Sequence, residues 1–475
     1  MAYPAIRKLC HGGLAITVAL GLDGCANLTP PADSEITQQA LAATPLPANW
    51  VSAGKAAEFD PAWLGFGDDG NAQALITEAL TNNPDLRIAA LRLEQSRLQV
   101  GIASAKLLPS VGIGAQYATD PTPGGAASSN GIGLMLSWEI DLWGRVRAER
   151  KAAEADYYSA TADYAYARQS LAAATLRAWL TAILAGRQLD LIHDALADSE
   201  HQLQVIDTRW RIGQATEYDL ALVKAQRQSY IDAMQSLEQS RLVALRGLEA
   251  LLGRYPAASI NVASTLPDVP ALPTTGTPIN IVERRPDMAA ARKQFESMFF
   301  SVQEARAARL PALSIFGGVG RMAKEIIGFV DTKKTLYPIG ASLVWPLFTG
   351  GQRQTVLEIR TVQQQEAVVK YTQTILRAMS EVENALSAES TLAARQQALR
   401  AKVVHYERAV ELVRIQLRVG QVDTYDVLQQ ELQLNRARSD EETVLAERLV
   451  QRINLHLALG GAFEPVVPVA VANPS

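Results

Sequence analysis

The stretch that determines the fold of this chain is residues 145–211, which read RVRAERKAAEADYYSATADYAYARQSLAAATLRAWLTAILAGRQLDLIHDALADSEHQLQVIDTRWR. It contains no proline and a single glycine, and it is rich in Ala, Leu, Arg, Gln and Glu, which favour helix. At about 1.5 Å per residue such a helix would extend roughly 100 Å, several times the length of an ordinary globular helix. A second stretch of the same kind covers residues 352–418. The sequence therefore predicts two very long helices.

The chain is a duplication of one plan. Short matching segments occur in the same order in both halves of the sequence. The distance along the chain between the two members of a pair changes only from about 202 to about 207 residues. The pairs are Asn83-Pro84-Asp85-Leu86 with Arg285-Pro286-Asp287-Met288, Lys106-Leu107-Leu108-Pro109 with Arg309-Leu310-Pro311, Ser137–Trp143 with Ser342–Phe348, and Arg211–Asp219 with Arg418–Asp426. We divide the chain into a signal peptide (1–24), an amino-terminal segment (25–82), a first repeat (83–253), a linker (254–282), a second repeat (283–461) and a tail (462–475).

Each half predicts a helix, two strands and a long helical hairpin. In the first half the leading helix covers residues 84–108 and ends at Pro109, which cannot continue it. Apolar residues then alternate with small or polar ones, which is a strand pattern. The apolar series are Val111, Ile113, Ala115 and Tyr117, then Ile132, Leu134, Leu136, Trp138, Ile140 and Leu142, and in the second half Leu313, Ile315 and Val319, then Ile339, Ala341, Leu343, Trp345 and Leu347.

Glycines are expected to reverse the chain at the far end of each long helix. Gly213 and Gly420 follow the two long helices, and return helices are predicted to run to about Leu252 and Leu459. The fold class is mainly α with a small β part. The short leading helix and the return helix together nearly match the long helix, so they could stack end to end beside it.

The amino terminus has the features of a secretory lipoprotein signal. A basic pair, Arg7-Lys8, precedes an apolar stretch that ends in Leu22-Asp23-Gly24-Cys25. This tetrapeptide matches a bacterial lipobox at three of four positions, Asp23 being the departure. Cys25 is therefore the predicted first mature residue and lipid anchor. The alternative is a plain cleaved signal with an incidental cysteine. Only Cys10, within the signal, could pair with it, so the mature chain has no disulfide.

Composition and motifs argue against catalysis and against nucleic acid. The formal net charge is −4, whereas a nucleic-acid partner normally requires a basic face. No apolar run of about 20 residues follows the amino terminus, so a conventional transmembrane helix is not expected in the mature chain. The histidines are scattered without a metal-binding spacing, and no phosphate-binding loop is present. We therefore expect no enzyme, no cofactor and no metal site, and any transport must draw its energy from a partner.

Four strands cannot close a membrane barrel alone, because open sheet edges are not tolerated in lipid. Strands of about ten residues can cross an outer membrane when tilted, and three chains would supply twelve. Aromatic rings near the strand ends are expected at the membrane interface. They are Trp138, Trp143, Trp345 and Phe348.

The chain resembles the TolC-type outer-membrane efflux family, in particular the lipoprotein branch that serves resistance-nodulation-division pumps. Several segments carry the resemblance, and Trp138–Arg145 is the most specific of them. The others are Asn83-Pro84-Asp85-Leu86, Leu108-Pro109, Arg284-Arg285-Pro286-Asp287 and Leu347-Phe348-Thr349-Gly350-Gly351. The resemblance implies a homotrimer with a twelve-stranded barrel in outer-membrane lipid. It also implies a helical barrel across the periplasm, engaged by a periplasmic adaptor and an inner-membrane pump.

Family members close the periplasmic end with acidic rings, which the resemblance places within residues 419–431. Asp426 matches one such aspartate, while Gln429 stands where a second is common; Asp423 and, in the first half, Asp219 are further candidates. Three copies of Asp426 would make a constriction that attracts cations. The alternative is that these are ordinary helix-start carboxylates. The turns Arg211-Ile212-Gly213 and Arg418-Val419-Gly420 resemble the motif that meets the adaptor.

The sequence therefore predicts an outer-membrane channel of a tripartite efflux system, a passive exit for small toxic compounds or drugs. Two alternatives remain. One is an exit duct for proteins in type I secretion, and the other is a periplasmic scaffold lipoprotein without a pore. The alternating strands argue against the scaffold, and no catalytic triad supports a hydrolase.

Overall fold

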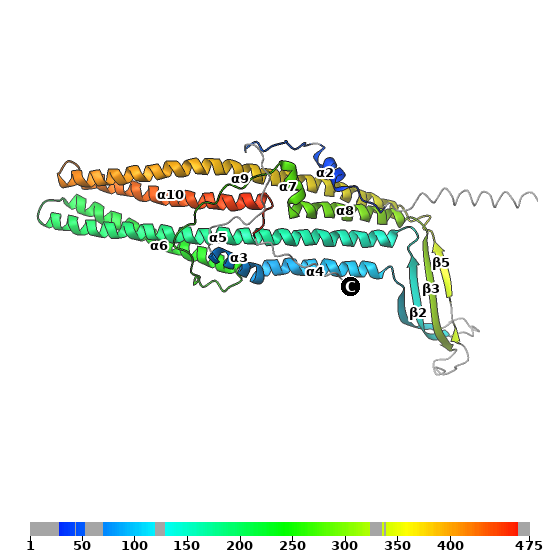
Figure 1. Cartoon of the computed structure of the whole chain (residues 1–475). Coiled ribbons are helices and arrows are strands. Elements are labelled where there is room, and N and C mark those ends of the chain that lie inside the picture. The colour runs from blue at the N-terminus through cyan, green and yellow to red at the C-terminus, as the bar shows by residue number, and fades with distance from the viewer. Residues whose placement is uncertain are drawn as a thin grey trace, which may run out of the picture. The chain divides into compact units, whose positions relative to one another are not determined.

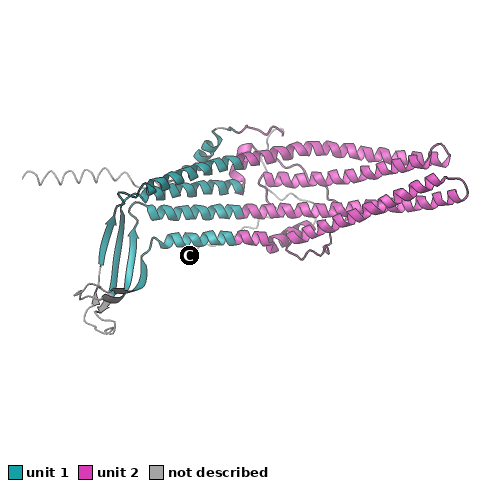
Figure 2. Cartoon of the chain, turned by 180° about the vertical axis from the view of Figure 1, so that it is seen from behind, with its two compact units in different colours: residues 1–45, 91–163, 287–374 teal, residues 46–90, 164–286, 375–475 magenta. Residues whose placement is uncertain are grey.

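The computed structural model describes residues 28–42, 44–52, 70–118, 129–323, 335–336 and 339–463. They form two compact units, each built from both halves of the sequence (Figure 2). Unit 1 contains residues 28–45, 91–163 and 287–374 of the described chain, and it holds the β-sheet. Unit 2 contains residues 46–90, 164–286 and 375–463, and it holds the tips of the helical hairpins.

Helices make up most of both units (Figure 1). Their bounds are α2 (Asp33–Leu41), α3 (Gly70–Asn82), α4 (Pro84–Ala105), α5 (Arg145–Arg211), α6 (Glu217–Leu251), α7 (Pro278–Arg284), α8 (Pro286–Ala307), α9 (Gln352–Arg418) and α10 (Thr424–Ala458). The two helices of 67 residues, α5 and α9, have the bounds predicted from the sequence. Helices α2, α3 and α7 were not predicted. None of the helices in the described ranges has both the length and the hydropathy needed to cross a membrane.

The sheet of unit 1 is antiparallel throughout. Its strands are β1 (Ser110–Ala118), β2 (Ser129–Ile140), β3 (Ala312–Ala323), β4 (Thr335–Leu336) and β5 (Ile339–Val344). β1 pairs with β2 and β2 with β3, so the two predicted hairpins form one sheet. β4 and β5 both pair with β3 in one register, because Leu336 faces Gly320 and Ile339 faces Gly317. Because β4 and β5 share this register, the described part of the sheet has the four predicted strand lines.

The register of this sheet puts the predicted apolar series on one face. Leu134 of β2 lies opposite Ile113 of β1 and Val319 of β3, and Leu313 lies opposite Leu343 of β5. Successive side chains in a strand point to opposite faces. The other face therefore carries mainly small or polar residues, which include Gly112, Gly114, Gly133, Ser137, Ser314, Gly318, Gly320, Gly340 and Ser342. The sheet thus has one apolar face and one face lined mainly by glycine and serine.

The turn from β2 into α5 explains the Trp138–Arg145 motif in physical terms. Asp141 accepts hydrogen bonds from the backbone N–H groups of Val146 and Arg147 at 3.0 and 2.9 Å and so caps α5. Arg145 makes two hydrogen bonds to Glu139, at 2.9 and 2.8 Å, and these bonds raise the pKa of its guanidinium. Gly144 between them has φ +78°, a conformation that favours glycine. The motif is a strand-to-helix turn fixed by charge.

In unit 2 the end of each return helix is bonded to the residue that precedes a leading helix. The Asn83 amide donates to the carbonyl of Leu251, the last residue of α6, at 2.9 Å. In the second half Arg285 donates to the carbonyl of Ala458, the last residue of α10, at 3.0 Å. Both side chains precede the proline that begins the next helix. In each half the end of the return helix is therefore bonded to the residue that precedes the leading helix, as the predicted end-to-end arrangement requires at this junction.

Candidate functional site

The hairpin tips of unit 2 are two copies of one turn. At the end of α5, Gly213 donates to Trp210 at 3.0 Å and Gln214 to Arg209 at 2.7 Å. At the end of α9 the same pattern joins Gly420 to Leu417 and Gln421 to Gln416. Both glycines have positive φ, +75° and +74°, as a Schellman helix end requires. The predicted turns Arg211-Ile212-Gly213 and Arg418-Val419-Gly420 are confirmed as reversals, and Ile212 and Val419 are exposed.

Two of the three candidate gate aspartates, Asp219 and Asp426, occupy the third position of a return helix. Asp219 accepts from the backbone N–H of Thr216 at 2.9 Å, while the Thr216 hydroxyl accepts from that of Asp219. Asp426 and Asp423 form the corresponding capping box at the start of α10. The alternative interpretation, a helix-start carboxylate, is thus observed for Asp219 and Asp426. This role is compatible with a gate, because Asp423 and Asp426 remain exposed. Gln429 lies half-buried one turn further along.

The first and second hairpins pack together at these tips. Leu428 of α10 joins a buried cluster with Ile206 of α5 and Leu220 and Val223 of α6. Hydrogen bonds from the Thr216 side chain, and less strongly from Thr424 of α10, lower the pKa of Asp219. The start of α6 is therefore linked to the start of α10.

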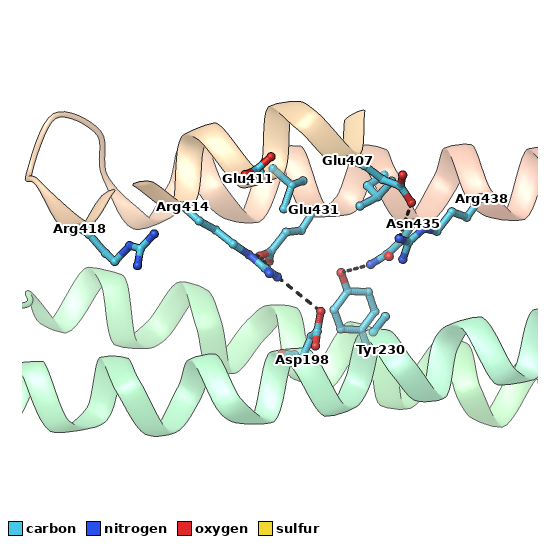
Figure 3. A pocket seen from close by; sticks show the side chains of 13 residues that line it. Asp198, Tyr230, Glu407, Glu411, Arg414, Arg418, Glu431, Asn435 and Arg438 are labelled. Carbon is cyan, nitrogen blue, oxygen red and sulfur yellow. Dashed lines mark hydrogen bonds and ion pairs between the residues drawn. The ribbon is translucent and has the colours of Figure 1, made fainter. Parts of the chain in front are cut away.

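A polar cleft of about 430 Å³ lies between the hairpins and extends along the helices from Arg418, beside the second turn (Figure 3). Four helices line it, α5 and α6 on one side and α9 and α10 on the other. We call it the tip cleft. Its charged and hydrogen-bonding lining residues include Asp198, Ser199, Tyr230, Glu407, Glu411, Arg414, Arg418, Glu431, Asn435 and Arg438.

Arg414 of α9 is the central cation of the tip cleft. Its guanidinium lies 2.7 Å from Glu431 of α10 and 3.4 Å from Asp198 of α5. Glu431 also accepts a hydrogen bond from Gln202 of α5. Desolvation opposes the charged form, but the hydrogen bonds and charges of Glu431 and Asp198 outweigh it and raise the pKa of Arg414. The second hairpin is thus tied to the first through a shared, partly buried network.

A second tie lies on the other side of the cleft, where Figure 3 shows Tyr230 pointing at Asn435. The Asn435 amide donates to the Tyr230 hydroxyl at 3.1 Å, which joins α6 to α10. Burial raises the pKa of this hydroxyl, so it stays neutral at physiological pH. We call Asp198, Gln202, Tyr230, Arg414, Glu431 and Asn435 together the cross-brace.

The cross-brace was not predicted from the sequence. Charged residues are common along both long helices, and nothing in their spacing distinguishes Arg414. The duplication was misleading at this point. At an offset of 207, the first-half counterparts of Arg414 and Glu431 are Asp207 and Lys224, whose charges are reversed. Only the three-dimensional arrangement shows that the brace joins unlike halves. Within the described ranges, no group of three or more potential metal ligands occurs.

The predicted interface aromatics differ in their surroundings. The indole N–H of Trp138 donates to the carbonyl of Leu107 at 2.9 Å, and that of Trp143 donates to Pro311 at 2.7 Å. These two rings pin the turns at the end of the sheet. Trp345 and Phe348 are 60% and 90% exposed, and their position at the membrane interface stays a prediction. Cys25, the predicted anchor, lies outside the described residues.

Two helices of 67 residues, a sheet with one apolar face in unit 1 and two braced hairpin tips in unit 2 are features of an outer-membrane channel subunit. Residues 75–254 and 278–461 match the sequence profile of the Outer membrane efflux protein family. The chain belongs to this family, and it is an outer-membrane efflux channel protein.

Individual relatives agree with this assignment. The chain is similar to Outer membrane protein OprJ of Pseudomonas aeruginosa, with 29% identity covering 97% of both chains. It is also similar to Toluene efflux pump outer membrane protein TtgF of Pseudomonas putida, with 28% identity covering 95% of this chain and 97% of the relative. Among solved structures, the open state of the Neisseria gonorrhoeae MtrE outer membrane channel has a TM-score of 0.78 at 26% identity, covering 88% of this chain and 96% of that one.

Proposed function

We propose that the chain forms a homotrimeric, lipid-anchored duct through which an inner-membrane pump expels small compounds across the periplasm and outer membrane. The observation that carries this proposal is the two-faced sheet. An apolar face suits lipid, and a face of glycine and serine suits a water-filled lumen. The chain acts by conducting, not by catalysis.

Trimerisation follows from the surfaces that one copy leaves open. Within the described strands, the outer edges of β1 and of β4 and β5 have no partner, a state that lipid does not tolerate. In unit 1, the flanking helices also expose apolar stripes at helical spacing. These are Leu91, Leu98 and Ile102 on α4 and Ile359, Val362 and Val369 on α9. A neighbouring copy would cover both the edges and the stripes, and three copies supply twelve strand lines.

The tips act as the periplasmic gate in this proposal. The cross-brace holds the second hairpin against the first, and three copies of Asp426 would face one another around the threefold axis. Asp423, Gln429 and Asp219 flank that ring. Opening requires the second hairpin to leave Asp198, Gln202 and Tyr230. The exposed turns at Gly213 and Gly420 are the surfaces that we assign to a periplasmic adaptor, which would supply the differential contacts that favour the open state.

Small compounds are favoured as cargo over proteins. TtgF is named for toluene, and other relatives are named for pyoverdine export and for cation efflux. None of these three names refers to a secreted protein. Within this varied group the particular cargo of the present chain is open to experiment. Deletion of the gene followed by a broad susceptibility panel would identify it, while a secretion defect without any change in susceptibility would favour type I secretion.

Conductance of purified trimers in planar bilayers tests the duct and its gate together. Wild type is expected to conduct weakly because the tips are closed. Arg414→Met removes the central cation of the cross-brace and should raise the open fraction about tenfold, as the loss of a charge-assisted hydrogen bond allows. Arg408→Met is the matched control, since Arg408 pairs with Glu411 on its own helix. Absence of conductance from all three proteins would support the scaffold alternative and end this proposal.

The lipid anchor at Cys25 is tested separately. Cells labelled with a clickable palmitate analogue should incorporate the label into the wild-type chain and not into Cys25→Ser. Equal labelling of the two proteins, or labelling of neither, would show that Cys25 is not acylated.

A further inference from the structure

A second cleft, of about 470 Å³, adjoins the tip cleft in unit 2. The two clefts share Arg414 and Glu431, and the second one also includes the first turn of α10. Its volume is within the range of about 300–1,000 Å³ that is common for small-molecule sites. Three arginines line it, one from α5 and two from α9, and we therefore call it the arginine cleft. They are Arg209, Arg414 and Arg418.

Apolar side chains from three helices form part of the wall of the arginine cleft. They are Val205 and Ile206 of α5, Leu417 of α9, and Val427 and Leu428 of α10. Ile206, Val427 and Leu428 are buried, whereas Val205 is 40% exposed and can be reached from the cleft. A ligand with an apolar body would remove this surface from water when it binds.

Two of the three arginines have no anionic partner in the described part of the chain. Arg414 is paired with both acids that line the cleft, Glu431 at 2.7 Å and Asp198 at 3.4 Å. Among the described residues, Arg209 and Arg418 make no ion pair and no side-chain hydrogen bond. The cleft therefore has an excess of positive charge beside its apolar wall.

The two unpaired arginines belong to different hairpins. Arg209 lies in the last turn of α5, and Arg418 is the last residue of α9. Figure 3 shows Arg418 pointing from α9 toward the first hairpin. Asp207, the acid nearest to Arg209 along α5, is already paired with Arg211 at 2.6 Å. An anion that binds both unpaired arginines would therefore join the first hairpin to the second.

We propose that the arginine cleft binds an amphipathic anion, a compound with one carboxylate or sulfonate group on an apolar body. The anionic group accepts charge-assisted hydrogen bonds from Arg209 and Arg418, whose guanidinium groups suit such oxyanions. The apolar body lies against Val205 and Leu417. A ligand held by both hairpins binds closed tips better than separated ones, so it favours the closed state. This last consequence rests on the gate in the proposed function, whereas the binding site does not.

Naphthalene-2-sulfonate is a suitable probe, because it carries one sulfonate on a rigid apolar ring system. Equilibrium dialysis against the purified protein in a non-ionic detergent, corrected for uptake by empty micelles, should show saturable binding. The uncharged compound naphthalene-2-methanol should bind at least about tenfold more weakly, as the loss of charge-assisted hydrogen bonds predicts. Equal affinity for the two probes, or no saturable binding of the sulfonate, would overturn the site.

Arg209→Met and Arg418→Met should each weaken binding of the sulfonate about tenfold and leave binding of the uncharged probe unchanged. Arg436→Met is the matched control, because Arg436 is an exposed arginine of α10 that lines neither cleft. Val205→Asp is an independent test, since a carboxylate in the cleft should repel the sulfonate. An affinity that falls in only one arginine variant would show that the anion does not join the hairpins, and an affinity unchanged in both would overturn the site.

Conductance tests the closing effect separately. Tyr230→Phe removes the hydroxyl that joins α6 to α10 and lies outside the arginine cleft, so this variant should open more often than wild type. Naphthalene-2-sulfonate should lower its conductance, and adding Arg209→Met should abolish that effect. Binding through both arginines without any change in conductance would overturn the closing effect. A protein that binds the probe but conducts in no variant would refute the duct and leave the binding site standing.

Discussion

Glu249 organises the loop after α6 through one buried carboxylate. It accepts backbone N–H bonds from Ala258, Ser259 and Ile260 at 2.6, 2.7 and 2.9 Å. Ala258 has φ +57°, which is uncommon for a residue with a side chain. The carboxylate therefore holds a strained turn against the end of the helix.

Replacing Glu249 by Gln should destabilise unit 2 by about 1–3 kcal/mol at pH 7, because one charged acceptor oxygen becomes a donor. Desolvation raises the pKa of Glu249, but the backbone bonds outweigh it and leave the pKa below its usual 4.5. A lowered pKa contributes stability that is present above pH 4.5 and is lost as the pH falls through the folded-state value. Thermal unfolding followed by circular dichroism should show the gap between the two proteins narrowing on acidification. A gap that widens instead would contradict this account.

Asp163 of α5 should behave in the opposite way. Desolvation raises its pKa, and the nearby Asp287 carboxylate adds to the effect. A raised pKa means that stability declines as the pH rises from the unfolded value of 3.8 through the folded one. Asp163→Asn should therefore stabilise the protein at pH 7, by less than about 1 kcal/mol after solvent screening, and should be neutral below pH 3.8. Melting temperatures at several pH values would check this, with Asp85→Asn as an exposed control.

At the scale of elements, two glycines with similar backbone angles have different surroundings. Gly213, at a tip, has open space where a Cβ would stand, so Gly213→Ala should cost only the backbone strain of about 1 kcal/mol. At Gly253 the same Cβ would lie 2.6 Å from the carbonyl oxygen of Asn82. Gly253→Ala should therefore cost clearly more and open the joint between α6 and α4. Denaturation midpoints of the two variants should differ; equal midpoints would argue that the joint is loose.

Sequence reasoning predicted the elements well where periodicity or composition is extreme. Both long helices could be predicted from runs of helix-forming residues without proline. The strand register could be predicted from the strict alternation of apolar residues, because a shift by one residue would move the apolar side chains of one strand to the opposite face of the sheet. Helix α2 was missed, because nine residues with two buried side chains give too little periodicity to read. The cross-brace was missed for a different reason. It depends on which helices become neighbours, and single charged residues in a charged helix carry no such information.

At the scale of the whole molecule, the two faces of β2 should respond oppositely to charge. Leu134 and Met135 are neighbours with similar exposure in one copy, 46% and 53%, but they point to opposite faces. If the apolar face meets lipid, Leu134→Arg should reduce the stability of the folded protein in the membrane by about 2–4 kcal/mol per copy. A trimer contains three copies of this substitution. Met135→Arg faces the lumen and should be tolerated. Yields of folded trimer in outer-membrane fractions should fall for the first variant only, and the reverse result would mean that the faces are assigned the wrong way round.

The reversed charges at corresponding positions of the two hairpins bear on why the duplicated gene became one polypeptide. In a ring of six separate identical hairpins, every hairpin would carry the same side chain at a given position. An arginine on one hairpin would then have an arginine at the corresponding position of the next hairpin. Covalent fusion lets alternate members of the ring diverge. One hairpin can then specialise as the stationary part of the gate and the other as the part that moves. A mutation in either hairpin occurs three times in the trimer, once in each copy of the chain.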